Sequence, residues 1–124
     1  MKVRVFEEFI GHKIKSFKNV EDRELIFELE NGKKYIFYHE QDCCESVYIE
    51  DINGDLIDIV GKEILKFEER MEYKRDDDYE SYTYTFYDIE TLDKHIQIRW
   101  CGSSNGYYSE SVYFASWEDY SKWN

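Results

Sequence analysis

Two stretches that alternate with a period of two residues decide the fold: YTYTFY at residues 82–87 and HIQIRW at residues 95–100. Large apolar or aromatic residues stand at every second position, from Tyr82 to Phe86 in the first stretch and from Ile96 to Trp100 in the second. Alternate residues of a strand share one side of it. With residues 90–94 as the connection, the two stretches predict an antiparallel hairpin that has one apolar face.

A second hairpin is predicted upstream. Asn31-Gly32 separates ELIFEL at residues 24–29 from KYIFY at residues 34–38. Asn-Gly readily adopts the positive φ angles of a type I′ turn. Residues 11–17 alternate as well, so they are expected to pair with the next strand, with a short helix before them.

The remaining segments complete an antiparallel architecture. Strands are predicted at residues 46–50, 63–73 and 111–114, although residues 67–71 fit a helix equally well. An exposed acidic hairpin tip is predicted at 76–80, and a tail or helical turn at 116–123. Asp51 in an N-cap position and Gly61 at the end predict one short helix between them. The expected fold class is mainly β (α+β): a single antiparallel, strongly twisted sheet or partly open barrel of about seven strands with one short helix.

Length and composition favour one small domain, residues 1–124. Aromatic residues make up 19% of the chain and supply the apolar surface for a core. Neither a membrane-spanning apolar run nor a signal peptide is recognised. Three cysteines are an odd number, and adjacent Cys43 and Cys44 do not bridge easily in strand geometry, so a reduced cytoplasm is expected.

Acidic charge is concentrated in one segment. The chain has 28 acidic and 16 basic side chains, a net charge of -12, which disfavours direct binding to nucleic acid or to an anionic membrane. Residues 40–61 contain no Lys or Arg. Their carboxylates, the predicted partner-binding face, are Glu40, Asp42, Glu45, Glu50, Asp51, Asp55 and Asp58.

Five segments are long or unusual in composition: QDCCESV at 41–47, EDINGDL at 50–56, YTYTFY at 82–87, IRW at 98–100 and SNGYYSESV at 104–112. In this order they resemble a family of small uncharacterised proteins that are common in bacteriophage and prophage genomes. The chain departs from that pattern at Tyr84, where the family more often has Trp, and at Cys101, where it more often has an aromatic residue. The resemblance implies a bacteriophage setting, a bacterial host cytoplasm and no particular activity, and Cys101 is expected to be a buried structural residue.

Two alternative sites are predicted from residue chemistry. Aromatic, hydroxyl and charged groups that suit a nucleotide-like ligand follow one another late in the chain: Arg99, Trp100, Asn105, Tyr107, Tyr108, Ser109 and Glu110. A metal is the second alternative, with His39, Asp42, Cys43 and Cys44 as candidate ligands. The adjacent cysteines disfavour a metal site, since neighbouring residues in a strand point to opposite faces.

No phosphate-binding loop, dinucleotide fingerprint, nucleophile elbow or helix-turn-helix pattern is found. The sequence therefore predicts a non-enzymatic accessory protein without a cofactor. Carboxylates on a rigid sheet can imitate backbone phosphates. The leading hypothesis is that the acidic face blocks a basic, nucleic-acid-handling host protein, such as a defence nuclease.

Overall fold

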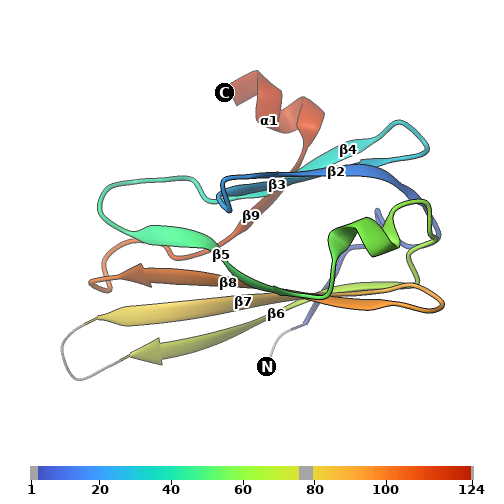
Figure 1. Ribbon diagram of the computed structural model, residues 1–124. Helices are drawn as coiled ribbons and strands as arrows, with labels where there is room; N and C mark the ends of the chain where they lie inside the picture. The colour runs from blue at the N-terminus through green and yellow to red at the C-terminus, as the bar shows by residue number, and fades with distance from the viewer. Residues whose placement is uncertain (1–2, 76–79, 124) are drawn as a thin grey trace.

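The computed structural model describes residues 3–75 and 80–123 and shows two antiparallel β-sheets packed face to face (Figure 1). The strands are β1 (Arg4–Val5), β2 (Ile14–Val20), β3 (Glu24–Leu29), β4 (Lys34–Tyr38), β5 (Ser46–Asn53), β6 (Lys66–Arg75), β7 (Ser81–Glu90), β8 (His95–Ser104) and β9 (Tyr113–Ser116). The five-stranded sheet has the order β1-β6-β7-β8-β5, and the four-stranded sheet β2-β3-β4-β9. The mainly β class is confirmed, but the described strands form two sheets instead of a single one.

The β7–β8 hairpin forms as predicted, but its two apolar sets lie on opposite faces of the sheet. Tyr87 lies opposite Ile98, and Tyr84 lies opposite Cys101. The set from Ile96 to Trp100 is therefore buried between the sheets, whereas the set from Tyr82 to Phe86 lies on the outer side. The expectation of one shared apolar face is wrong, because this register turns Thr85, Tyr87 and Ile89 inward.

The consecutive positive φ angles of a type I′ turn were predicted in the β3–β4 turn but occur in another turn. The β3–β4 hairpin forms, but its turn has one left-handed residue, Gly32 (φ 91), whose N–H donates to the Leu29 carbonyl at 3.0 Å. Two consecutive positive φ values occur instead between β2 and β3, at Glu21 (φ 53) and Asp22 (φ 60). The Arg23 N–H closes that turn on the Val20 carbonyl at 2.9 Å.

Helical structure is sparse in the described chain. The predicted helix over 51–61 is a single 3-10 turn, η1 (Leu56–Ile59), and its N-cap is Asp55 because β5 continues to Asn53. Turns, not a helix, precede β2. The C-terminal segment forms α1 (Trp117–Trp123), and residues 76–79 of the predicted acidic tip lie outside the described residues. None of the described helices has the length and hydrophobicity to span a membrane.

Aromatic rings fill the space between the sheets. Phe6 and Phe9, which precede β2, are 1% and 0% exposed and enter this space from the side. The Phe9 ring stacks on Phe67 with centroids 4.4 Å apart, and Phe67 stacks on Phe37 at 5.6 Å. Each sheet thus buries its inner face against the other, which leaves the outer faces, edges and loops for binding.

The turn between β2 and β3 also links the two sheets at one edge. The Asp22 carbonyl accepts a 2.7 Å hydrogen bond from the Ile49 N–H of β5, and Arg23 Nη1 donates to the Val47 carbonyl at 3.2 Å. Strand β5 is an end strand of the five-stranded sheet. Its exposed backbone groups are therefore partly covered by the opposite sheet.

Candidate functional site

A pocket of about 470 Å³ lies where α1 folds over the outer side of the four-stranded sheet (Figure 1). We call it the acid–tyrosine pocket. Its lining residues are Glu24, Tyr38, His39, Glu40, Gln41, Ala115, Asp119 and Tyr120. Glu24 begins β3 opposite Tyr38 at the end of β4, and α1 contributes residues from the other end of the chain. Only the fold brings these segments together.

Direct contacts hold the two tyrosines of this pocket in place. Tyr120 Oη donates to Glu24 Oε2 at 2.7 Å, and the Tyr120 ring meets the Tyr38 ring edge to face, with centroids 4.8 Å apart. The hydrogen bond to Glu24 raises the pKa of Tyr120 to about 12, so its hydroxyl remains a donor at neutral pH. Three carboxylates and two rings line the pocket without a Lys or Arg, which suits a cationic side chain.

The adjoining loop, residues 39–45, is organised around a buried ion pair. His39 Nε2 lies 2.8 Å from Glu45 Oε2, and the two side chains are 3% and 0% exposed. Glu45 also accepts from the backbone N–H groups of Asp42 (2.9 Å) and Cys43 (2.8 Å). These hydrogen bonds, led by the one from His39, lower the pKa of Glu45 to about 2. His39 Nδ1 lies 2.7 Å from the Ser111 carbonyl oxygen, which holds the ring between Glu45 and the segment before β9.

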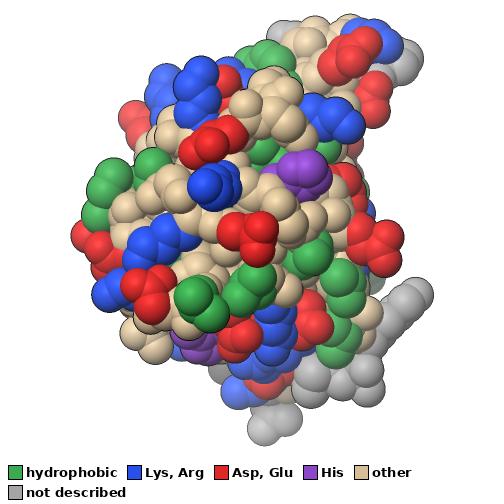
Figure 2. Space-filling model, turned by 90° about the vertical axis from the view of Figure 1, so that its right-hand side faces the viewer, with side chains coloured by type: hydrophobic (Ala, Val, Ile, Leu, Met, Phe, Trp, Pro, Cys, Tyr) green, Lys and Arg blue, Asp and Glu red, His purple; other side chains and the backbone are tan. Residues whose placement is uncertain are grey.

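The structure separates the seven carboxylates of the predicted acidic face. Glu45 is buried beside His39. The other six are exposed: Glu40, Asp42, Glu50, Asp51, Asp55 and Asp58. Of these, Glu50 pairs with Arg99 at 2.8 Å. Asp55 is partly committed, since its carboxylate accepts from the Ile57 N–H at 3.1 Å. At the end of the sandwich that carries η1, acidic and basic side chains are intermingled (Figure 2).

The predicted nucleotide-like site is not assembled as one cluster. Trp100 is 0% exposed between the sheets, whereas Arg99 points to the outer side and pairs with Glu50. Tyr107 is 88% exposed. Asn105 and Tyr108 do share a small pocket of about 220 Å³, with Cys44, Glu80, Ser103 and Ser104. That volume is below the roughly 300–1,000 Å³ of typical ligand pockets.

Glu110, the last member of that predicted site, is a buried structural carboxylate. It accepts hydrogen bonds from the hydroxyls of Ser81, Ser104 and Thr83, the last at 2.9 Å. It packs directly over Gly102, where an added Cβ would lie 2.6 Å from the Glu110 carbonyl oxygen. Glu110 therefore joins the ends of β7 and β8 to the segment before β9.

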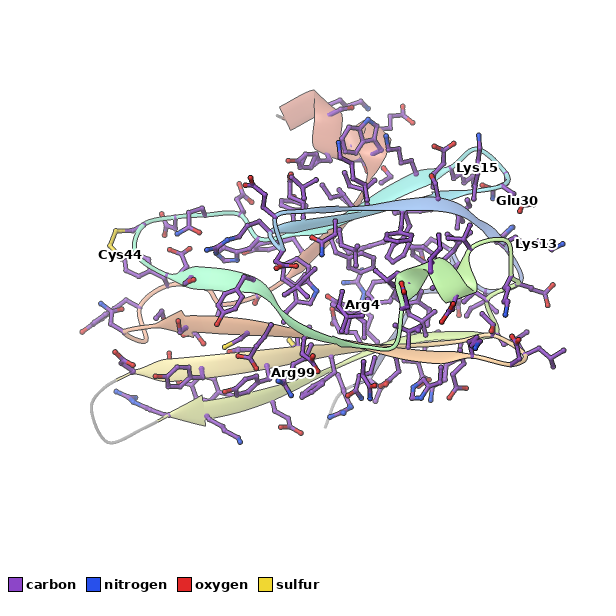
Figure 3. The ribbon with its side chains drawn as sticks, in the orientation of Figure 1. Arg4, Lys13, Lys15, Glu30, Cys44 and Arg99 are labelled. Carbon is purple, nitrogen blue, oxygen red and sulfur yellow. A yellow bond between two sulfur atoms is a disulfide. The ribbon has the colours of Figure 1, made fainter. Side chains whose placement is uncertain are left out.

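Three of the four candidate metal ligands are engaged with each other or with the protein, and the fourth, Asp42, is exposed. Both His39 nitrogens face protein acceptors, and Cys43 and Cys44 form a disulfide at the tip of the loop (Figure 3). The expectation that these cysteines do not bridge is wrong, because they lie in a loop where strand geometry does not apply. Over residues 3–75 and 80–123, no group of three His, Cys, Asp or Glu side chains is arranged to hold a metal ion.

Cys101 is buried, as expected, but outside the space between the sheets. It lies between Tyr48 and Tyr84 in register on the outer side of the five-stranded sheet. Burial and the nearby Glu50 carboxylate raise the pKa of Cys101 to about 11, so it stays a thiol at neutral pH.

Sequence reasoning missed most of the acid–tyrosine pocket. Of its acidic residues only Glu40 belongs to the predicted face, whereas Glu24 is in the predicted hairpin of residues 24–38 and Asp119 is in the predicted tail. The motif WEDYSKW at residues 117–123 carried a usable signal, since acids precede a tyrosine in a short amphipathic helix. Its position over β3 and β4 was not readable from the sequence.

Comparisons with known proteins identify a family and nothing more specific. No curated protein and no solved structure matched the chain. A family model described as a domain of unknown function, DUF7448, matches residues 7–114, which include all strands except β1 and the end of β9. The chain therefore belongs to this family, the domain of unknown function DUF7448.

Proposed function

We propose that this chain is a non-catalytic accessory protein of bacteriophage origin, acting in the host cytoplasm, that binds and blocks a basic surface of a nucleic-acid-handling host protein. The observation that carries the proposal is the acid–tyrosine pocket, which three carboxylates and two ordered tyrosine rings line without a Lys or Arg. Its one imidazole, His39, is turned towards Glu45 and the Ser111 carbonyl. A lysine or arginine of the partner enters this pocket, and the remaining exposed carboxylates of the 40–58 segment contribute long-range attraction.

Charge and shape support this function together. A net charge of -12 accelerates association with a positive surface and makes it sensitive to salt. A ring face next to carboxylates favours an organic cation over a small hydrated metal ion, because the ring also contacts the alkyl or guanidinium part. The pocket walls are held by the Tyr120–Glu24 hydrogen bond, so little ordering is needed on binding.

A pull-down of the tagged protein from nuclease-treated bacterial lysate, at low and moderate salt, tests the proposal. We expect a basic nucleic-acid-handling protein to be identified by mass spectrometry and to be lost as salt rises. Recovery of no protein, or only of acidic proteins, would contradict the proposed function.

Matched variants locate the binding surface. Glu40→Gln with Asp119→Asn removes two charges from the pocket, and Glu7→Gln with Glu30→Gln removes two exposed charges elsewhere. We expect the first pair to reduce capture strongly and the second to leave it nearly unchanged. Equal losses would show that net charge alone, and not the pocket, determines binding.

A third pair separates the pocket from the β5 side. Asp51→Asn with Asp58→Asn is suitable because both residues are exposed, whereas Asp55 caps η1. We expect an intermediate loss of capture from this pair. A loss larger than that of the pocket pair would place the main contact on β5 and contradict the role of the pocket.

A further inference from the structure

The open edge of β6 has the properties of a self-pairing strand, and it is independent of the acidic surface. Among the described residues, β1 pairs only with Glu68 and Glu69 of β6. Beyond them, within residues 3–75 and 80–123, residues 70–75 of β6 pair with β7 alone. This part of β6 extends past the four-stranded sheet (Figure 1).

The direction of the backbone groups follows from the alternation in an antiparallel ladder. The Phe67 carbonyl accepts a 3.0 Å hydrogen bond from Phe6 N–H, so its polar groups point away from β7. The β6–β7 register is continuous to Arg75, so every second residue after Phe67 points the same way. The N–H and C=O groups of Met71, Tyr73 and Arg75 therefore face the open edge.

The side chains on this segment are exposed although two of them are large and apolar. Met71 is 46% exposed and Tyr73 is 63% exposed, because their side of the sheet is not covered there by the four-stranded sheet. At the opposite edge, in contrast, the β2–β3 turn occupies the Ile49 N–H of β5. The β5 edge of the five-stranded sheet is thus partly covered by the β2–β3 turn, whereas no described segment covers residues 70–75 at the β6 edge.

We propose that β6 pairs antiparallel with β6 of a second copy of this chain, with Tyr73 facing Tyr73 across a two-fold axis, to form a continuous sheet through two molecules. In this register Met71 lies opposite Arg75 of the second copy, and all three outward-facing residues form backbone hydrogen bonds. Glu72 lies opposite Lys74 of the second copy, twice by symmetry.

Charge complementarity favours a second copy as the partner and disfavours the two registers next to the Tyr73-centred one. A register centred on Glu72 sets two Glu72 side chains against each other and Arg70 against Lys74 of the second copy. One centred on Lys74 sets two lysines against each other. Charged residues such as Lys74 usually protect an edge strand from pairing. Here the Tyr73-centred register turns that protection into two favourable pairs, so unrelated strands are rejected and a second copy is accepted.

The pairing is small, so the dimer is weak. Five residues of each copy bury much less than the roughly 1,600 Å² of a standard specific interface. We therefore expect a monomer at low micromolar concentration and a dimer at several hundred micromolar, on the order of what such small contacts support.

Complementary single variants test the proposal by sedimentation velocity. Lys74→Glu sets Glu72 against glutamates, and Glu72→Lys sets Lys74 against lysines, so each variant alone is expected to dimerise at least about tenfold more weakly. In an equimolar mixture each molecule of one variant meets opposite charges on the other, and dimers are expected to return. Lys15→Glu on β2, a charge reversal away from β6, is the control and is expected to dimerise like the unsubstituted protein.

Three results would overturn this proposal. They are a protein that remains monomeric up to about millimolar concentration, single variants that dimerise as the unsubstituted protein does, and a mixture that stays monomeric although each variant retains the near-UV circular dichroism of the folded protein. The last result would exclude the Tyr73-centred register.

Discussion

The turn between β2 and β3 gives a quantitative test of how this fold is built. Glu21 and Asp22 both have positive φ, at 53° and 60°, a conformation in which residues other than glycine are disfavoured by about 1–2 kcal/mol each. Asn followed by Gly adopts this pair of conformations most readily. The double substitution Glu21→Asn and Asp22→Gly is therefore expected to stabilise the protein.

The expected gain is smaller than the strain that is removed. Glycine at position 22 gives the unfolded chain more conformational entropy, which lowers the free energy of unfolding by about 0.4–1 kcal/mol. The substitution also deletes the exposed 2.8 Å hydrogen bond from Asn19 Nδ2 to Asp22 Oδ1, which contributes about 0.5 kcal/mol. The Asp22 carbonyl that accepts from Ile49 remains. The net increase in the free energy of unfolding is about 0.5–3 kcal/mol.

Urea unfolding followed by tryptophan fluorescence measures this change, since Trp100 is fully buried. The midpoint is expected to rise with an unchanged slope. Gly32→Ala is the matched control: Gly32 has φ +91 and an added Cβ meets nothing within 4 Å, so a loss of about 1 kcal/mol measures backbone strain alone. The reasoning is refuted if the double variant has an unchanged or lower midpoint while Gly32→Ala destabilises.

Three further predictions concern the buried groups. Glu45 has a folded-state pKa of about 2 against an ordinary value of 4.5, so its stabilising effect is present above about pH 4.5 and is lost as the pH falls towards 2. In this window the melting temperature of the unsubstituted protein should fall more steeply with pH than that of Glu45→Gln, and parallel curves would contradict this. Gly102→Ala forces a Cβ to within 2.6 Å of the Glu110 carbonyl oxygen and should lower the free energy of urea unfolding by about 1–3 kcal/mol, whereas an unchanged midpoint would mean that the segment before β9 yields freely. Phe9→Ala removes a ring that is 0% exposed and should lower the free energy of urea unfolding by about 3–5 kcal/mol. A loss under about 1 kcal/mol would show that the segment before β2 does not belong to the core.

Local patterns were sufficient for the strands and their neighbours in sequence. Alternation over 82–87 and 95–100, with a five-residue connection, predicted the β7–β8 hairpin, and Asn31-Gly32 predicted the β3–β4 hairpin. Both features act through the conformations of adjacent residues, which are encoded locally. The concentration of acids in residues 40–61 is likewise a property of the sequence alone, as is the net charge of -12.

The tertiary structure decided which side of each strand is buried and which charges remain available. Alternation defines two faces but does not say which one meets the opposite sheet, so Tyr82, Tyr84 and Phe86 were placed on the wrong side. Glu110 became buried because a distant donor, Ser81, reaches its carboxylate. Glu45 became buried because the short loop over residues 39–45 folds around it, with His39 as one donor. The acid–tyrosine pocket needs Glu24 and Tyr120, which are separated by 96 residues, to lie 2.7 Å apart. A contact of that kind depends on how the two sheets and α1 pack, and no local pattern contains it.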